Sequence, residues 1–126
     1  MRREEIVKRL AGTKPSRDPS NEAFERLSGD IPAKLRIKPR EIRQAAVLVP
    51  IVDHPENPTL LLTKRTDHLP DHPGQISFPG GQVEAADNNL EHTALRELEE
   101  ETGVSRERVD LVGYLPPYLT ITGFVV

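Results

Sequence analysis

The chain has 126 residues, which corresponds to one domain, and its formal net charge is −3. This acidic balance argues against general binding to nucleic acid or to an anionic membrane, and the lack of cysteine excludes disulfides, thiol nucleophiles and thiolate metal sites. The charged first ten residues and the absence of a long apolar run argue against a signal peptide and a membrane-spanning helix, so we expect a soluble, cytoplasmic protein.

The N-terminal third predicts a short helical extension. Apolar residues recur among charges in residues 2–10, a pattern typical of a short amphipathic helix, and residues 21–27 predict another turn or two. Two prolines in residues 12–20 make that stretch a linker. We therefore expect a helical extension over 1–41 ahead of the main domain, 42–126.

The main domain begins with strands. Residues 42–52 are rich in Val, Ile and Ala, and residues 59–63 answer them across a turn with two prolines, which predicts a pair of strands. We expect further strands at residues 75–78, 82–83, 109–115 and 121–126, with a bend at Pro79-Gly80-Gly81.

Residues 89–102 predict the one long helix. Asn88 is the expected N-cap, with Glu91 three residues later as a near capping box, and Gly103 is the expected C-terminal stop. The apolar stripe of this helix consists of Leu90, Ala94, Leu95 and Leu98.

Three carboxylates share another face of the same helix. Glu97, Glu100 and Glu101 stand at i, i+3 and i+4, which brings their Cβ atoms within roughly 5–6 Å of each other. Like charges in this arrangement repel one another unless a cation lies among them, and carboxylate oxygens suit Mg²⁺ or Mn²⁺. The helix therefore predicts a metal site for phosphate chemistry.

The sequence around these glutamates resembles the Nudix box, a signature of hydrolases that act on nucleoside diphosphates linked to another group. Residues 96–104 (RELEEETGV) match the second half of the box at every defined position. The first half departs from it, because its acidic position falls on Asp87 rather than on a glutamate and the interval to Arg96 is one residue longer. The resemblance implies an α/β (α+β) fold, an α/β/α sandwich with a mixed sheet.

Two upstream stretches resemble the signature of the coenzyme A pyrophosphatase branch of this family. They are residues 61–65 (LLTKR) and 72–81 (HPGQISFPGG). Members of that branch also tend to have the longer interval, so the departure from the general box supports this branch.

The resemblance implies a role for each matching residue. Glu97 and Glu101 are the principal metal ligands, Glu100 is a further ligand or the general base, and the carbonyl oxygen of Gly81 is a backbone ligand. Arg96 orients the carboxylates; the alternative is an ordinary i, i+4 ion pair between Arg96 and Glu100, worth a few tenths of a kcal/mol. The catalytic set is thus Glu100, Arg96 and Glu97.

Basic and polar residues of the two upstream stretches are candidates for substrate binding. Lys64 and Arg65 could face phosphates, including the 3′-phosphate of coenzyme A, although solvated lysines and arginines are common at strand ends. The full candidate set is Lys64, Arg65, His72, Gln75, Ser77 and Gly80. A zinc pair of His68 and His72 is disfavoured, because Pro70 and Pro73 disfavour the helix that the pair requires.

The expected reaction is metal-dependent hydrolysis of the pyrophosphate bond of coenzyme A or its thioesters. Two alternatives stay open: a Nudix hydrolase of another nucleoside diphosphate derivative, and a non-catalytic nucleotide-binding Nudix domain. Because residues 121–126 form an apolar run without a turn or polar tail, we expect a domain truncated at its C-terminus, with a naturally short chain as the alternative. An exposed strand of this kind also favours homo-oligomers.

Overall fold

The computed structural model describes residues 1–26, 42–64, 74–120 and 123–126. The elements follow in the order α1 (Arg3–Leu10), α2 (Pro19–Arg26), β1 (Arg43–Val47), β2 (Ile51–Val52), β3 (Thr59–Leu60), β4 (Thr63–Lys64), β5 (Ile76–Ser77), β6 (Gly80–Gln82), α3 (Leu90–Thr102), the 3₁₀ turn η3 (Arg106–Arg108) and β7 (Phe124–Val125). Within these ranges no helix is long and apolar enough to cross a membrane.

Strand β1 is the centre of a three-stranded sheet with the order β6-β1-β7. It runs antiparallel to β6, with Ala46 opposite Gly81, and parallel to β7, with Gln44 opposite Val125. Two smaller antiparallel pairs, β2–β3 and β4–β5, lie outside this sheet. The predicted mixed sheet and α+β class are therefore confirmed. A strand pair does cross the turn before residue 59, but it is limited to β2 and β3, because the expected strands 42–52 and 59–63 are each divided in two.

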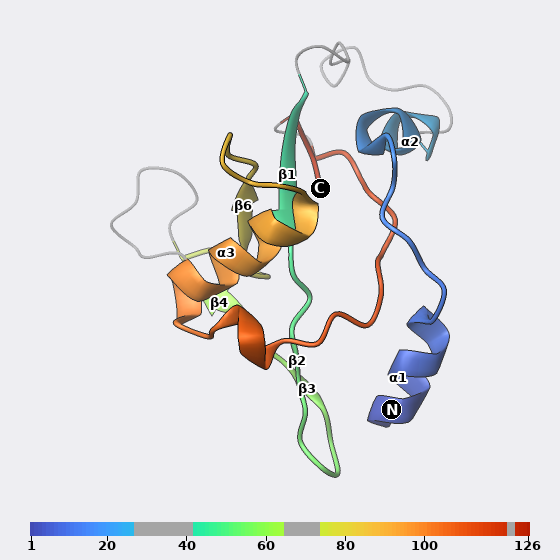
Figure 1. Ribbon diagram of the computed structural model, residues 1–126, viewed down its shortest axis with the longest axis vertical. Helices are drawn as coiled ribbons and strands as arrows, with labels where there is room; N and C mark the ends of the chain where they lie inside the picture. The colour runs from blue at the N-terminus through green and yellow to red at the C-terminus, as the bar shows by residue number, and fades with distance from the viewer. Residues whose placement is uncertain (27–41, 65–73, 121–122) are drawn as a thin grey trace.

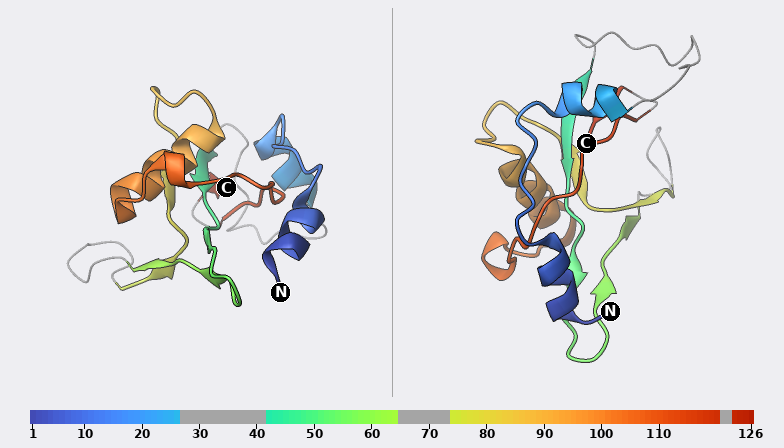
Figure 2. Two further views of the ribbon diagram at one scale, coloured as in Figure 1. Left: turned by 60° about the horizontal axis from the view of Figure 1, so that its bottom comes forward. Right: turned by 90° about the vertical axis from the view of Figure 1, so that its right-hand side faces the viewer.

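Helices lie on both sides of β1 (Figures 1 and 2). Helix α3 lies on one side, against β1 and β6, while α1 and α2 lie on the other. The core on the α3 side contains Ala46 and Leu48 from β1 and the residue that follows it, packed with Ala94 and Leu98 from α3. The apolar stripe of the helix thus packs as predicted, while Glu97 and Glu101 on the adjoining acidic face lie against β6.

Both ends of α3 are capped, but the N-cap is Asn89, not Asn88. Asn89 has extended backbone, and its side-chain oxygen accepts a 2.8 Å hydrogen bond from the backbone N–H of His92. The ring of His92 in turn accepts from the backbone N–H of Asn88, at 3.2 Å, so Glu91 has no part in the cap that we predicted. Gly103 ends the helix as expected, in the left-handed conformation with φ 78°.

Two further expectations about local structure need correction. The bend expected over Pro79-Gly80-Gly81 is limited to Pro79, because Gly80 and Gly81 belong to strand β6. Residues 109–115 form no strand, although all of them are described. Gly113 lies instead close to Leu10 at the end of α1, and the backbone N–H of Tyr114 donates a 2.8 Å hydrogen bond to the hydroxyl of Thr13, just beyond that helix.

Leu98 tests how far the packing of α3 stabilises the domain. Its side chain is only 2% exposed, so Leu98→Ala should lower the free energy of unfolding by roughly 2–5 kcal/mol through lost burial and the cavity left behind. Urea denaturation measures the change. Leu115→Ala is the control, because Leu115 is 65% exposed and its truncation should change stability by less than about 0.5 kcal/mol. Equal losses in both variants would contradict the core assigned to α3.

Candidate metal and phosphate site

The guanidinium of Arg96, on the acidic face of α3, lies at the centre of the candidate site. It forms a two-pronged ion pair with Asp87, in which Nε and Nη2 donate to the two carboxylate oxygens at 2.9 and 3.0 Å. Nη2 also donates to the backbone carbonyl of Gln82 at 3.2 Å. Paired parallel hydrogen bonds of this kind are strong and directional, so this edge of the guanidinium has a defined orientation.

Asp87 is itself held from two further directions. The backbone N–H of Glu84 and the hydroxyl of Thr93 each donate to its Oδ2 at 2.9 Å, and its side chain is 1% exposed. The hydrogen bond from Arg96 is the main cause that holds the pKa of Asp87 well below its usual range, and the same pair raises the pKa of Arg96. Both groups therefore remain charged at neutral pH.

The remaining nitrogen of the guanidinium, Nη1, faces three more carboxylates. It lies 3.0 Å from Glu97, 3.3 Å from Glu100 and 3.5 Å from Glu84. The i, i+4 pair with Glu100 is thus one of the longer contacts of Arg96. Arg96 joins four carboxylates from the helix and the preceding loop, as the orienting role implies.

Glu97 lies directly against strand β6. A Cβ atom at Gly81 would overlap the carboxylate of Glu97, so glycine is what allows this approach. Burial raises the pKa of Glu97, hydrogen bonding to Arg96 acts in the opposite direction, and the charges of Glu100 and Glu84 raise it further. A partly buried carboxylate among other acids is an environment that a cation would stabilise.

Glu101 contacts the neighbouring glycine. Its Oε2 accepts a 3.1 Å hydrogen bond from the backbone N–H of Gly80. A Cβ atom at Gly80 would come within 2.5 Å of the carbonyl oxygen of Ala46 on β1. The glycine pair therefore lets β6 approach both α3 and β1, which a routine turn would not require.

The expected metal ligands do not converge on one point in this structure. In the part of the chain that the structure describes, no three carboxylate or imidazole side chains form a group that could hold a metal ion. Glu97 and Glu100 face Arg96, whereas Glu101 faces Gly80. Their chemistry nevertheless fits Mg²⁺ or Mn²⁺, because all the donors are hard oxygens and negative charge exceeds positive charge around Arg96. Metal binding by these residues stays a prediction.

Three of the predicted substrate-binding residues gather on the β4–β5 ribbon. Lys64 pairs with Ile76 and Thr63 pairs with Ser77, and Gln75 immediately precedes β5. Lys64, Gln75 and Ser77 are all exposed. The ribbon continues through Pro79 into β6 and so joins the glycine pair. Arg65, His68 and His72 lie outside the described residues.

Sequence reasoning treated Asp87 only as a departure from a motif and did not identify Thr93 or Glu84. One signal was available, because Thr93 lies three residues before Arg96 and so on the same side of a helix. The other was the acidic pair Glu84 and Asp87, spaced as in a tight turn just after the glycines. The structure closes this turn by a 3.0 Å hydrogen bond from Asp87 N–H to the carbonyl of Glu84.

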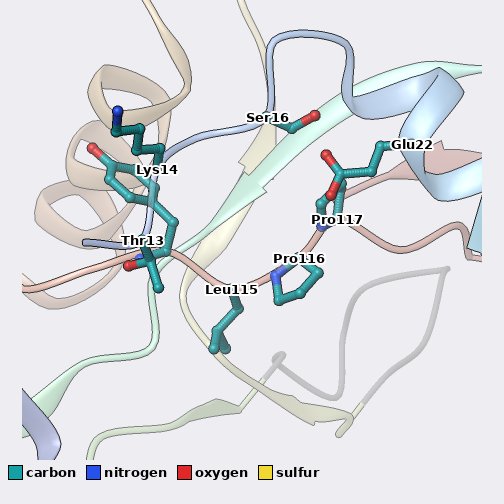
Figure 3. A pocket seen from close by; sticks show the side chains of 8 residues that line it. Thr13, Lys14, Ser16, Glu22, Leu115, Pro116 and Pro117 are labelled. Carbon is teal, nitrogen blue, oxygen red and sulfur yellow. The ribbon is translucent and has the colours of Figure 1, made fainter. Parts of the chain in front are cut away.

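Two cavities lie away from these carboxylates. A small one of about 210 Å³ lies between residues 13–22 and 114–117, with Lys14, Ser16 and Glu22 among its lining residues (Figure 3). A larger, mainly apolar groove of about 1250 Å³ reaches the apolar face of α3 at Ala94 and Leu98. None of the predicted site residues that the structure describes lines either cavity, so we assign the site by its carboxylates and not by its volume.

Comparison with known proteins gives this arrangement its family context. Residues 42–124 match the model of the NUDIX domain. The chain belongs to the Nudix family. It is 52% identical over 84 residues to a protein named Uncharacterized Nudix hydrolase NudL from Enterobacter sp. (strain 638). The matched residues make up 67% of this chain and 43% of that relative.

Relatives with the same name occur in other bacteria. The match to the one from Pectobacterium atrosepticum is 45% identical over 106 residues, 84% of this chain and 54% of the relative. The match to the one from Cronobacter sakazakii is 55% identical over 84 residues, 67% of this chain and 43% of the relative. The chain thus spans about half the length of the curated relatives it matches.

The pairing of Asp87 with Arg96 predicts how stability depends on pH. A carboxylate with a depressed folded pKa stabilises the fold above its unfolded pKa, about 3.9, and this contribution is lost as pH falls through the folded pKa. Asp87→Asn should therefore lower the free energy of unfolding at pH 7, and the difference from wild type should shrink as pH falls from about 4 to about 2.

Urea denaturation across this pH range measures the difference. Asp53→Asn is the matched control, because Asp53 pairs with Arg3 at 2.9 Å but both side chains are 56% exposed. Exposed ion pairs of this kind contribute little, so this variant should follow wild type at every pH. A pH-independent difference for Asp87→Asn would contradict the ion-pair assignment.

Proposed function

We propose that this chain provides the metal site of a Nudix hydrolase that cleaves the pyrophosphate bond of coenzyme A or its thioesters. The products are adenosine 3′,5′-bisphosphate and 4′-phosphopantetheine or its acyl form. The observation that carries the hydrolase assignment is the set of carboxylates around Arg96, beside Gly80 and Gly81, within the region that matches the NUDIX domain. Nudix hydrolases generally use divalent cations and act on small molecules.

The proposed ligands of Mg²⁺ or Mn²⁺ are Glu97, Glu100, Glu101 and the carbonyl oxygen of Gly81. A bound divalent ion supplies polarisation of the phosphoryl oxygens and a lower pKa for the attacking water. Arg96 keeps Glu97 and Glu100 together through Nη1. Glu100 is 57% exposed, which leaves its carboxylate accessible either as a further metal ligand or, instead, as the general base that would accept the proton of that water.

The substrate assignment rests on the resemblance of residues 61–65 and 72–81 to the coenzyme A pyrophosphatase branch. Lys64 is exposed on the ribbon that leads into the glycine pair, a position from which its ammonium group can meet a phosphate. We assign it to the 3′-phosphate of coenzyme A, with Gln75 and Ser77 on the same ribbon as further contacts. Arg65, His72 and Gly80 complete the proposed binding set.

Glu97→Gln tests the metal assignment. The amide keeps the shape of the side chain but removes the charge, and turnover should fall by more than about 100-fold, since loss of groups that merely orient a ligand already costs 10–100-fold. Glu99→Gln on the same helix is the control, because Glu99 is exposed and is not one of the carboxylates that pair with Arg96. Release of adenosine 3′,5′-bisphosphate from coenzyme A, with Mg²⁺ or Mn²⁺ present, measures the activity of both variants. Equal activity in the two would contradict the assignment.

A substrate panel tests the finer proposal, on a chain that continues this sequence to the length of its relatives. Coenzyme A should be hydrolysed much faster than ADP-ribose. Removal of the 3′-phosphate, as in dephospho-coenzyme A, should raise KM, and Lys64→Ala should raise KM for coenzyme A but not for dephospho-coenzyme A. A preference for ADP-ribose or a dinucleoside polyphosphate would favour the other hydrolase reading. Tight nucleotide binding without turnover of any diphosphate would favour the non-catalytic reading.

A further inference from the structure

Thr93 is a fully buried polar residue on α3, between the apolar stripe and the acidic face. Its side chain is 0% exposed, and its hydroxyl lies 2.9 Å from Oδ2 of Asp87 and 3.3 Å from the carbonyl oxygen of Asn89. A hydroxyl has one proton to donate, and the charged, nearer acceptor is the stronger of the two. The main partner of Thr93 is therefore the carboxylate of Asp87.

This hydrogen bond begins a chain of contacts that ends at the proposed metal ligands. Asp87 orients one edge of the guanidinium of Arg96 through two hydrogen bonds. That orientation directs Nη1 toward Glu97 and Glu100. Asp87 lies in the loop before α3, whereas Thr93, Arg96 and the glutamates lie on α3, so Thr93 links the loop acid to the helix that carries the ligands.

We propose that Thr93 is a positioning residue for the metal site. Its hydroxyl holds Asp87, and Asp87 holds the guanidinium of Arg96 at the point where it spaces Glu97 and Glu100 for a divalent cation. The part of this inference that concerns the cation rests on the proposed function. The part that concerns Arg96 rests on the contacts alone.

A purely structural role for Thr93 would be the common hydrogen bond of a helical hydroxyl to the carbonyl four residues earlier. Thr102, on the same helix, makes such a bond to the carbonyl of Leu98 at 2.7 Å. Its hydroxyl also accepts a 3.2 Å hydrogen bond from the backbone N–H of Val104, and neither of these two partners is a carboxylate. Thr102→Val therefore measures the effect of losing a partly buried hydroxyl from α3 without touching Asp87.

The first experiment measures Mn²⁺ affinity by electron paramagnetic resonance in wild type, Thr93→Val, Thr93→Ser and Thr102→Val. Thr93→Val keeps the shape but removes the hydroxyl, and it should weaken binding by about tenfold, the lower end of the effect of groups that orient ligands. Thr93→Ser and Thr102→Val should bind within about twofold of wild type. Equal affinity of wild type and Thr93→Val would overturn the proposal. If Thr93→Val does not fold, Thr93→Ala compared with Thr93→Ser isolates the same hydroxyl.

The second experiment needs no metal and separates this inference from the proposed function. Solvent exchange of the Nε–H of Arg96 is followed by NMR in the presence of a chelator, with the signal assigned by its loss in Arg96→Lys. Exchange should be about tenfold faster in Thr93→Val and unchanged in Thr102→Val, because the proton is donated to Asp87. Unchanged exchange in Thr93→Val would overturn the positioning role even if Mn²⁺ binds. Faster exchange in a protein that binds no Mn²⁺ would support the positioning of Arg96 and overturn the metal assignment.

Discussion

The ion pair between Asp87 and Arg96 is the interaction on which the rest of the site depends. It joins the loop after β6 to the middle of α3, and its four-way hydrogen bonding keeps a nearly inaccessible carboxylate charged. Without a paired cation, burying this carboxylate would be costly. With the pair in place, Nε and Nη2 of the guanidinium are bound to Asp87, and Nη1 remains to contact the glutamates.

The glycine pair supplies the second constraint, which is close approach. Gly80 lies so near β1, and Gly81 so near Glu97, that any side chain there would collide with its neighbour. The carboxylates are thereby brought close to the backbone and to one another, and Arg96 offsets their mutual repulsion only in part. Burial is the main cause that raises the pKa of Glu97, Arg96 acts in the opposite direction, and the charges of Glu100 and Glu84 add to the rise, so a divalent cation would stabilise this carboxylate.

Helix α3 contributes one face to the apolar core and another face to the acidic site. Its apolar face packs Ala94 and Leu98 against β1, while its acidic face holds Arg96 and the glutamates. Thr93 lies at the boundary, where a side chain must be small enough for the core and polar enough to reach Asp87. The packing of the helix and the geometry of the carboxylates are therefore coupled through neighbouring turns.

Local sequence determined the long helix, its glycine stop, the apolar stripe and the i, i+3, i+4 spacing of the glutamates, because helical periodicity depends on near neighbours alone. It also indicated the strand pair before residue 63, whereas the mixed α+β class came from the resemblance to the Nudix box. Only tertiary structure decided that Asp87 pairs with Arg96 and Thr93, that the glycines lie inside β6, and that residues 109–115 form no strand. These outcomes depend on which distant surfaces meet, which the spacing of residues along the chain does not determine.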